Sequence, residues 1–126
     1  MNHGGKPLPV MGFGTSRITE VDKIESAIKA GYRHLDTASF YGNEDVVGEA
    51  LSRCIEQGVV SREDIFVTTK IWHTEYEDPE KAIRQSLTKL KLDYVDLYLM
   101  HWPNNGFSMP KVPLHVFWPK LETLVD

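Results

Sequence analysis

The sequence has little of what extracellular, membrane-spanning or nucleic-acid-binding proteins require. Its single cysteine, Cys54, cannot form an intrachain disulfide, which fits a reducing compartment. Lysine and arginine number 14 against 18 aspartate and glutamate residues, so no excess of positive charge is present to bind phosphates or anionic lipid. No stretch approaches the roughly 18 apolar residues of a membrane span, and residues 1–6 lack the apolar region of a signal peptide. We therefore expect a cytoplasmic protein without nucleic-acid or membrane partners.

Metal-ligand spacing is also absent from the sequence. The five histidines include no pair such as His-Glu-x-x-His, so we expect no metal. Cys54 lies in an amphipathic segment, which favours a buried small apolar group over a reactive thiol. The hydrophobic share of 41% and the charged share of 25% are close to average, so residues 1–126 are expected to form one domain at most.

Strand-like and helix-like segments alternate four times along the chain, with a period of about thirty residues. The strands are expected at 10–14, 32–36, 65–70 and 94–100, and the first is expected to be buried. The helices are expected from a capping box at Thr19 and Asp22 to Gly31, from Asn43 to Gly58, from Asp78 to Leu90, and from near Pro113. This alternation predicts an α/β protein with a parallel sheet and right-handed crossovers. Periodicity leaves two arrangements open: a small doubly wound sheet, or half of an eight-stranded barrel.

Four polar side chains follow the predicted strands in a way that suggests chemistry. Asp36, Lys70 and His101 each end a strand, and Tyr41 lies in the loop after the second. In a barrel the carboxyl ends of the strands converge on one face, so the four could share a pocket. A phenol holds its proton too tightly for transfer at neutral pH, and a nearby ammonium such as that of Lys70 favours the phenolate. Asp36 could orient the lysine, and His101 could donate a hydrogen bond to a substrate carbonyl.

Such a set could protonate a carbonyl oxygen while hydride reaches the carbon, provided that a nicotinamide lies alongside. Taken singly, each residue has a structural explanation: a strand-end ion pair for Asp36 and Lys70, or a simple turn at Tyr41. Trp72 and Trp102, close behind Lys70 and His101, are equally consistent with packing at the rim and with a substrate wall.

A family resemblance adds to this interpretation. Residues 31–38 read Gly-Tyr-Arg-His-Leu-Asp-Thr-Ala and are followed by Tyr41-Gly42-Asn43-Glu44 and by Gly48. These residues closely resemble the signature of the aldo-keto reductase superfamily, and segments 11–15, 67–72 and 96–103 are similar to family segments in order and spacing. The resemblance implies the N-terminal half of a (β/α)8 TIM barrel, with four parallel strands, crossover helices and an N-terminal turn or hairpin.

The resemblance also implies roles for individual residues. Tyr41 would be the proton donor, Lys70 and Asp36 its tuning pair, and His101 the residue that orients the carbonyl. The implied contacts to an NADPH cofactor come from Gly14, Thr15, Ser16, Asp36, Tyr41 and Lys70. The implied substrate pocket is lined by Trp72, His101, Trp102 and Phe107. Ser16 departs from the family pattern, because many members carry tryptophan there.

The implied function is NADPH-dependent reduction of aldehydes or ketones. A complete barrel needs about 250 residues, so a C-terminal half-barrel or another protein is expected to cover the open edges. One alternative is a truncated, non-catalytic structural or interaction subunit of the same ancestry. An independent dinucleotide-binding domain is poorly supported, because Gly12-Phe13-Gly14 is followed by Arg17 where a G-x-G-x-x-G motif needs its third glycine.

Overall fold

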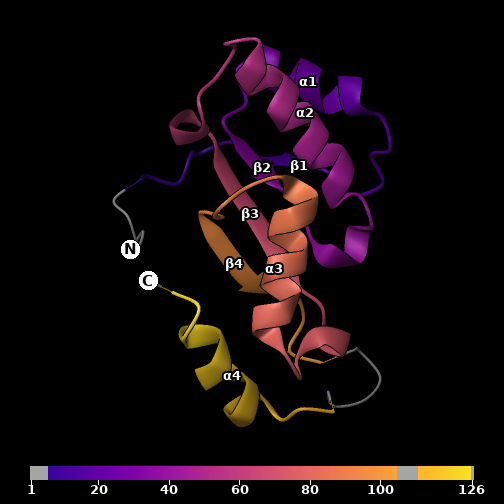
Figure 1. Cartoon of the computed structure of the whole chain (residues 1–126), viewed down its shortest axis with the longest axis vertical. Helices are drawn as coiled ribbons and strands as arrows, with labels where there is room; N and C mark the ends of the chain where they lie inside the picture. The colour runs from indigo at the N-terminus through magenta and orange to yellow at the C-terminus, as the bar shows by residue number, and fades with distance from the viewer. Residues whose placement is uncertain (1–5, 105–110, 126) are drawn as a thin grey trace.

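The computed structural model describes residues 6–104 and 111–125, and a parallel sheet lies at its centre (Figure 1). Its strands are β1 (Phe13–Gly14), β2 (His34–Asp36), β3 (Phe66–Ile71) and β4 (Leu97–Met100). They are hydrogen-bonded in the order β1-β2-β3-β4, and every neighbouring pair is parallel. A doubly wound sheet reverses its strand order at a switch point, whereas a barrel adds strands consecutively. The observed order is therefore that of the first half of a barrel, which the periodicity left open and the family resemblance implied.

The crossover helices form where the apolar periodicity predicted them. They are α1 (Val21–Lys29), α2 (Glu44–Glu56), α3 (Pro79–Leu90) and α4 (Leu114–Glu122), and Figure 1 shows α4 at the opposite end of the molecule from α1. Short 3₁₀ turns lie at Ser39–Tyr41 (η1), Arg62–Asp64 (η2) and His73–Glu75 (η3). Glycines at positive φ follow the ends of α1 and α2, where Gly31 has φ +109° and Gly58 has φ +68°. These are the left-handed positions at which a helix commonly ends on glycine.

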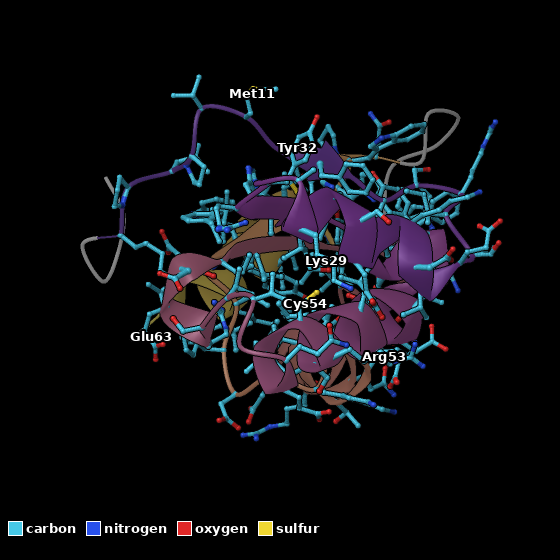
Figure 2. The ribbon with its side chains drawn as sticks, turned by 90° about the horizontal axis from the view of Figure 1, so that it is seen from above. Met11, Lys29, Tyr32, Arg53, Cys54 and Glu63 are labelled. Atoms are coloured by element: carbon cyan, nitrogen blue, oxygen red, sulfur yellow. The ribbon has the colours of Figure 1, made fainter. Side chains whose placement is uncertain are left out.

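The main core lies between the sheet and helices α1, α2 and α3. It is built from fully or almost fully buried side chains: Ile24, Ile28, Leu35, Val47, Ala50, Leu51, Cys54, Val60, Ile65, Val67 and Leu90. Cys54 is buried as expected, and burial raises the pKa of its thiol. Figure 2 shows its sulfur in the interior, with Met11 at the periphery. A second cluster around Tyr76 and Phe117 packs α4 against the carboxyl end of β3, where Ile71 lies, and the two aromatic rings are stacked with their centres 4.0 Å apart.

Several local predictions were wrong. The first strand covers only Phe13–Gly14, and Val10 and Met11 are exposed, because β2 offers only three residues for pairing and no described element covers them. The capping box at Thr19 does not form, since α1 begins after Glu20 and the Thr19 hydroxyl donates to the Glu20 carboxylate instead. Strand β4 begins at Leu97 rather than at Tyr94.

Other predictions concern the ends of the chain and the membrane. The described residues 6–12 form no strand or hairpin, and residues 1–5 lie outside the described part. The last helix begins beside Pro113, as predicted. Within 6–104 and 111–125, no helix has the length and apolar character needed to cross a membrane.

Candidate active site

Three of the four predicted polar residues are in direct contact. The Lys70 ammonium donates to Asp36 Oδ1 at 2.5 Å and to the Thr37 carbonyl at 2.9 Å. The same Nζ atom lies 3.4 Å from the Tyr41 hydroxyl and 5.1 Å from the centre of its ring. Only 12% of the Lys70 side chain is exposed, against 33% of Asp36, so the ammonium relies on these protein oxygens more than on water. The arrangement places a positive charge directly against a phenol.

The contact follows from the sheet register. Asp36 is the last residue of β2 and pairs with Thr68, so Lys70, two residues further along β3, points to the same face just beyond the end of β2. The chain then turns through η1, which places the Tyr41 hydroxyl over the lysine. Gly42 ends this turn with φ +67°, a backbone conformation that glycine adopts readily. Residues distant in the sequence therefore meet at the carboxyl edge of the sheet.

His101 completes the cluster through its ring. Its backbone N–H donates to the Ile71 carbonyl at 3.1 Å, which continues the pairing of β4 with β3 by one residue. The imidazole packs edge-on against Tyr41, with the ring centres 5.6 Å apart. Burial, followed by the charge of Lys70, lowers the pKa of His101, so the ring is neutral at neutral pH and carries one N–H donor. Its Nδ1 is buried without a hydrogen-bond partner among the described residues.

Aromatic side chains form one wall beside the cluster. Trp72 lies 5.2 Å from His101 and 5.5 Å from Trp102, measured between ring centres. Phe40 stacks on Trp72 at 4.2 Å and is 60% exposed. Sequence reasoning missed Phe40, although its position next to Tyr41 in a loop at the carboxyl edge was the available signal. Phe107 lies outside the described residues.

The loop after β1 adjoins the cluster through Thr15. This residue is fully buried, and its hydroxyl donates to the Asp36 carbonyl at 3.0 Å. Asn43 donates from Nδ2 to the carbonyls of Thr15 and Ile18, at 2.7 and 2.8 Å, instead of capping α2 with its side chain as predicted. Gly14 and Ser16 remain exposed. The loop is therefore fixed from behind by Thr15 and Asn43.

Potential metal ligands are dispersed. Within the described ranges, no group of three or more histidine, cysteine, aspartate or glutamate side chains could hold a metal ion.

Known proteins resemble this chain in sequence. The model of the aldo/keto reductase family matches residues 10–126. An aldehyde reductase of Saccharomyces cerevisiae is 54% identical over 79% of this chain and 31% of its own length. An aldose reductase of Encephalitozoon cuniculi is 39% identical over 98% of this chain and 47% of its own length. The chain thus spans less than half the length of these curated relatives.

Solved structures agree with the sequence matches. A Bombyx mori aldo-keto reductase in complex with NADP superimposes with a TM-score of 0.84 and 34% identity, over 97% of this chain and 44% of that one. The aldose reductase of Schistosoma japonicum gives a TM-score of 0.86 and 36% identity, over 99% of this chain and 48% of that one.

Strand order and the position of the polar cluster define the N-terminal half of a parallel (β/α)8 barrel with side chains gathered at its carboxyl mouth. The sequence and structure matches described above all fall within one family of such barrels. The chain belongs to the aldo/keto reductase family.

Proposed function

We propose that this chain provides the proton-transfer half of an NADPH-dependent reductase of aldehydes or ketones. The observation that carries the proposal is the position of the Lys70 ammonium, which contacts Asp36 Oδ1 at 2.5 Å and the Tyr41 hydroxyl at 3.4 Å. A phenol beside an ammonium can release its proton to a carbonyl oxygen that gains negative charge, because the ammonium stabilises the phenolate that remains.

Each side chain has a separate task in this proposal. Tyr41 donates the proton to the carbonyl oxygen of the substrate. Lys70 stabilises the phenolate, and Asp36 orients the lysine through a short ion pair. The neutral His101 ring donates a hydrogen bond that orients the carbonyl, without adding a second positive charge beside Lys70.

One structural observation supports a nicotinamide cofactor beside the loop after β1. A Cβ added to Gly14 would meet no atom within 4 Å, and Ser16 beside it is exposed, so the loop leaves open space at the mouth. We assign cofactor contacts to Gly14 and Ser16, and at the centre of the mouth to Asp36, Tyr41 and Lys70. When bound, NADPH would supply the hydride. The buried Thr15 side chain then supports the loop rather than touching the cofactor.

The aromatic wall favours apolar substrates. Phe40 and Trp72 lie beside the His101 ring, and Trp102 packs against Trp72. Phe40 and Trp102 are 60% and 46% exposed. An aromatic aldehyde could stack on this wall while its oxygen reaches Tyr41. We therefore expect aryl aldehydes to be reduced with a lower KM than small polar aldehydes.

The complete reductase requires a second half-barrel. The strand edges of β1 and β4 have no neighbour among the described strands, and barrel enzymes commonly bind cofactor phosphates after strands seven and eight. We propose a C-terminal half-barrel as the partner that covers these edges and supplies those phosphate contacts.

The test is an assay of aldehyde-dependent NADPH oxidation. The full chain is assayed alone and together with the C-terminal half of the matched Saccharomyces cerevisiae aldehyde reductase, with benzaldehyde as the substrate. We expect turnover in the assembled protein. Absence of turnover in both arrangements would contradict the proposal and favour the non-catalytic subunit.

Two tyrosine variants make the test specific. Tyr41→Phe deletes the transferable proton, so we expect loss of turnover with NADPH binding retained, as measured by fluorescence titration. Tyr94→Phe deletes the same group at the amino end of the sheet, where the ring stacks on Arg62 at 3.9 Å, and should leave turnover unchanged. Equal turnover of the two variants would reject Tyr41 as the donor.

A further inference from the structure

Glu44 is a buried acid for which the proposed proton transfer gives no role. Only 2% of the residue is exposed, and its carboxylate makes no ion pair with any described lysine, arginine or histidine. It accepts hydrogen bonds from the Thr69 hydroxyl at 2.6 Å and from the Ser86 hydroxyl at 3.1 Å. A buried acid without a counter-ion costs stability, and burial raises the pKa of Glu44. Its two hydroxyl partners show where it acts.

The Thr69 hydrogen bond joins the two chain segments that carry the reacting groups. Glu44 is the first residue of α2 and lies three residues after Tyr41. Thr69 precedes Lys70 in β3, and consecutive strand residues point to opposite faces, so Thr69 faces the helices while Lys70 faces the site. The carboxylate therefore connects the loop of Tyr41 to the strand of Lys70 from behind.

The Ser86 hydrogen bond provides a comparison within the same carboxylate. Ser86 lies on α3 and is 2% exposed, while Thr69 is fully buried, so both hydroxyls are shielded from water. Ser86 is remote in the sequence from Tyr41 and Lys70, and its bond links α2 to α3 only. If Glu44 only stabilised the fold, loss of either hydrogen bond would affect the contact between Tyr41 and Lys70 to the same extent.

We propose that Glu44 is a positioning residue whose hydrogen bond to Thr69 sets the contact between the Tyr41 phenol and the Lys70 ammonium. The inference rests on the proposed function only for its kinetic consequence. The geometry that it concerns, a separation of 3.4 Å between the phenol oxygen and the ammonium nitrogen, is a property of this chain alone.

The experiment compares two variants that each remove one hydroxyl from the same carboxylate. Thr69→Val preserves the shape of the side chain and removes the bond to β3, while Ser86→Ala removes the bond to α3. The full chain is prepared with isotope-labelled tyrosine rings, and the NMR signal of Tyr41 is assigned by its loss in Tyr41→Phe. We expect the Tyr41 signal to shift in Thr69→Val and to remain at its wild-type position in Ser86→Ala.

Further variants guard against a change in folding. Thr69→Ser retains the hydroxyl and should restore the wild-type Tyr41 signal. Glu44→Gln can still accept from Thr69 and donate to Ser86, so it should also preserve the signal, whereas Glu44→Ala should shift it. An unmoved Tyr41 signal in folded Thr69→Val or Glu44→Ala would overturn the proposal, as would equal shifts in Thr69→Val and Ser86→Ala.

The kinetic measurement uses the assembled protein with the supplied C-terminal half. Misplacement of a reacting group by about 1 Å can cost about a hundredfold in rate, so we expect Thr69→Val to lower kcat by about ten- to a hundredfold with little change in KM. Ser86→Ala should retain wild-type kcat. If the wild-type protein shows no turnover, the proposed function fails, and the NMR comparison still decides the role of Glu44.

Discussion

Gly48 lies where α2 crosses α3, and the space beside it is occupied by backbone. A Cβ added at this position would lie 2.4 Å from the Lys89 carbonyl oxygen and 2.6 Å from the Leu90 carbonyl carbon. Because these are backbone atoms, an alanine can fit only if the two helices move apart. Overpacking of this kind costs about 1–3 kcal/mol, and the gain in helix propensity from glycine to alanine returns about 1 kcal/mol. The approach of 2.4 Å to backbone puts this site at the upper end of the overpacking cost, so we expect Gly48→Ala to lower the free energy of unfolding by about 2 kcal/mol.

Urea unfolding followed by circular dichroism measures this change directly. The midpoint should fall in Gly48→Ala without a change in the m-value, since the surface exposed on unfolding is nearly the same. Gly14→Ala is the matched control, because a Cβ there meets no atom within 4 Å, and its stability should stay within about 0.5 kcal/mol of wild type. A Gly48→Ala protein as stable as wild type would refute the reasoning that backbone contact excludes a side chain at this crossing.

Three further predictions concern the site and its support. Lys70→Met should lower kcat of the assembled protein by about 10²–10⁴, because the phenolate loses its stabilising charge, and an unchanged kcat in steady-state assays would remove that role. Tyr76→Phe should cost about 1–2 kcal/mol in urea unfolding, because Tyr76 is fully buried and donates to the Trp102 carbonyl. Stability should also fall as the pH drops below about 6.5. Burial and the charge of Lys70 lower the pKa of His101 in the folded protein, so below this pH the unfolded chain binds more protons at His101 than the folded chain does. Urea midpoints measured across this range should depend less on pH in His101→Gln.

The arrangement of the site along the sheet could be predicted from the sequence because it depends on period and strand polarity. The alternation of apolar patterns gives four parallel strands, and parallel strands bring their carboxyl ends to one edge. Asp36, Lys70 and His101 each stand at such an end or within one residue of it, so their proximity follows without knowledge of any side-chain contact. Tyr41 is added by the short loop after β2, which is too short to carry it away from that edge.

Features that depend on competing partners could not be predicted. Asn43 has the residue type of a helix cap, but two carbonyls of the β1 loop lie within reach and take its amide. Thr19 similarly bonds the adjacent Glu20 carboxylate rather than the backbone of α1. Val10 has the apolar character of a buried strand, yet burial requires a covering element, and none exists in the described residues. In each case the local preference is correct and the tertiary environment decides the outcome.

The segment Tyr41–Glu44 shows why a short signature can specify a whole site. Tyr41 presents the phenol, and Gly42 at φ +67° allows the chain to turn from η1 into α2. Asn43 ties this turn to the loop after β1 through the carbonyls of Thr15 and Ile18, and Glu44 ties it to β3 beside Lys70. Four consecutive residues thus meet four different physical demands, so we expect a change at any one of them to act on the geometry set by the others. Additive effects of Asn43→Ala and Thr69→Val on the Tyr41 NMR signal would mean that the two ties act independently, whereas non-additive effects would identify the segment as one cooperative unit.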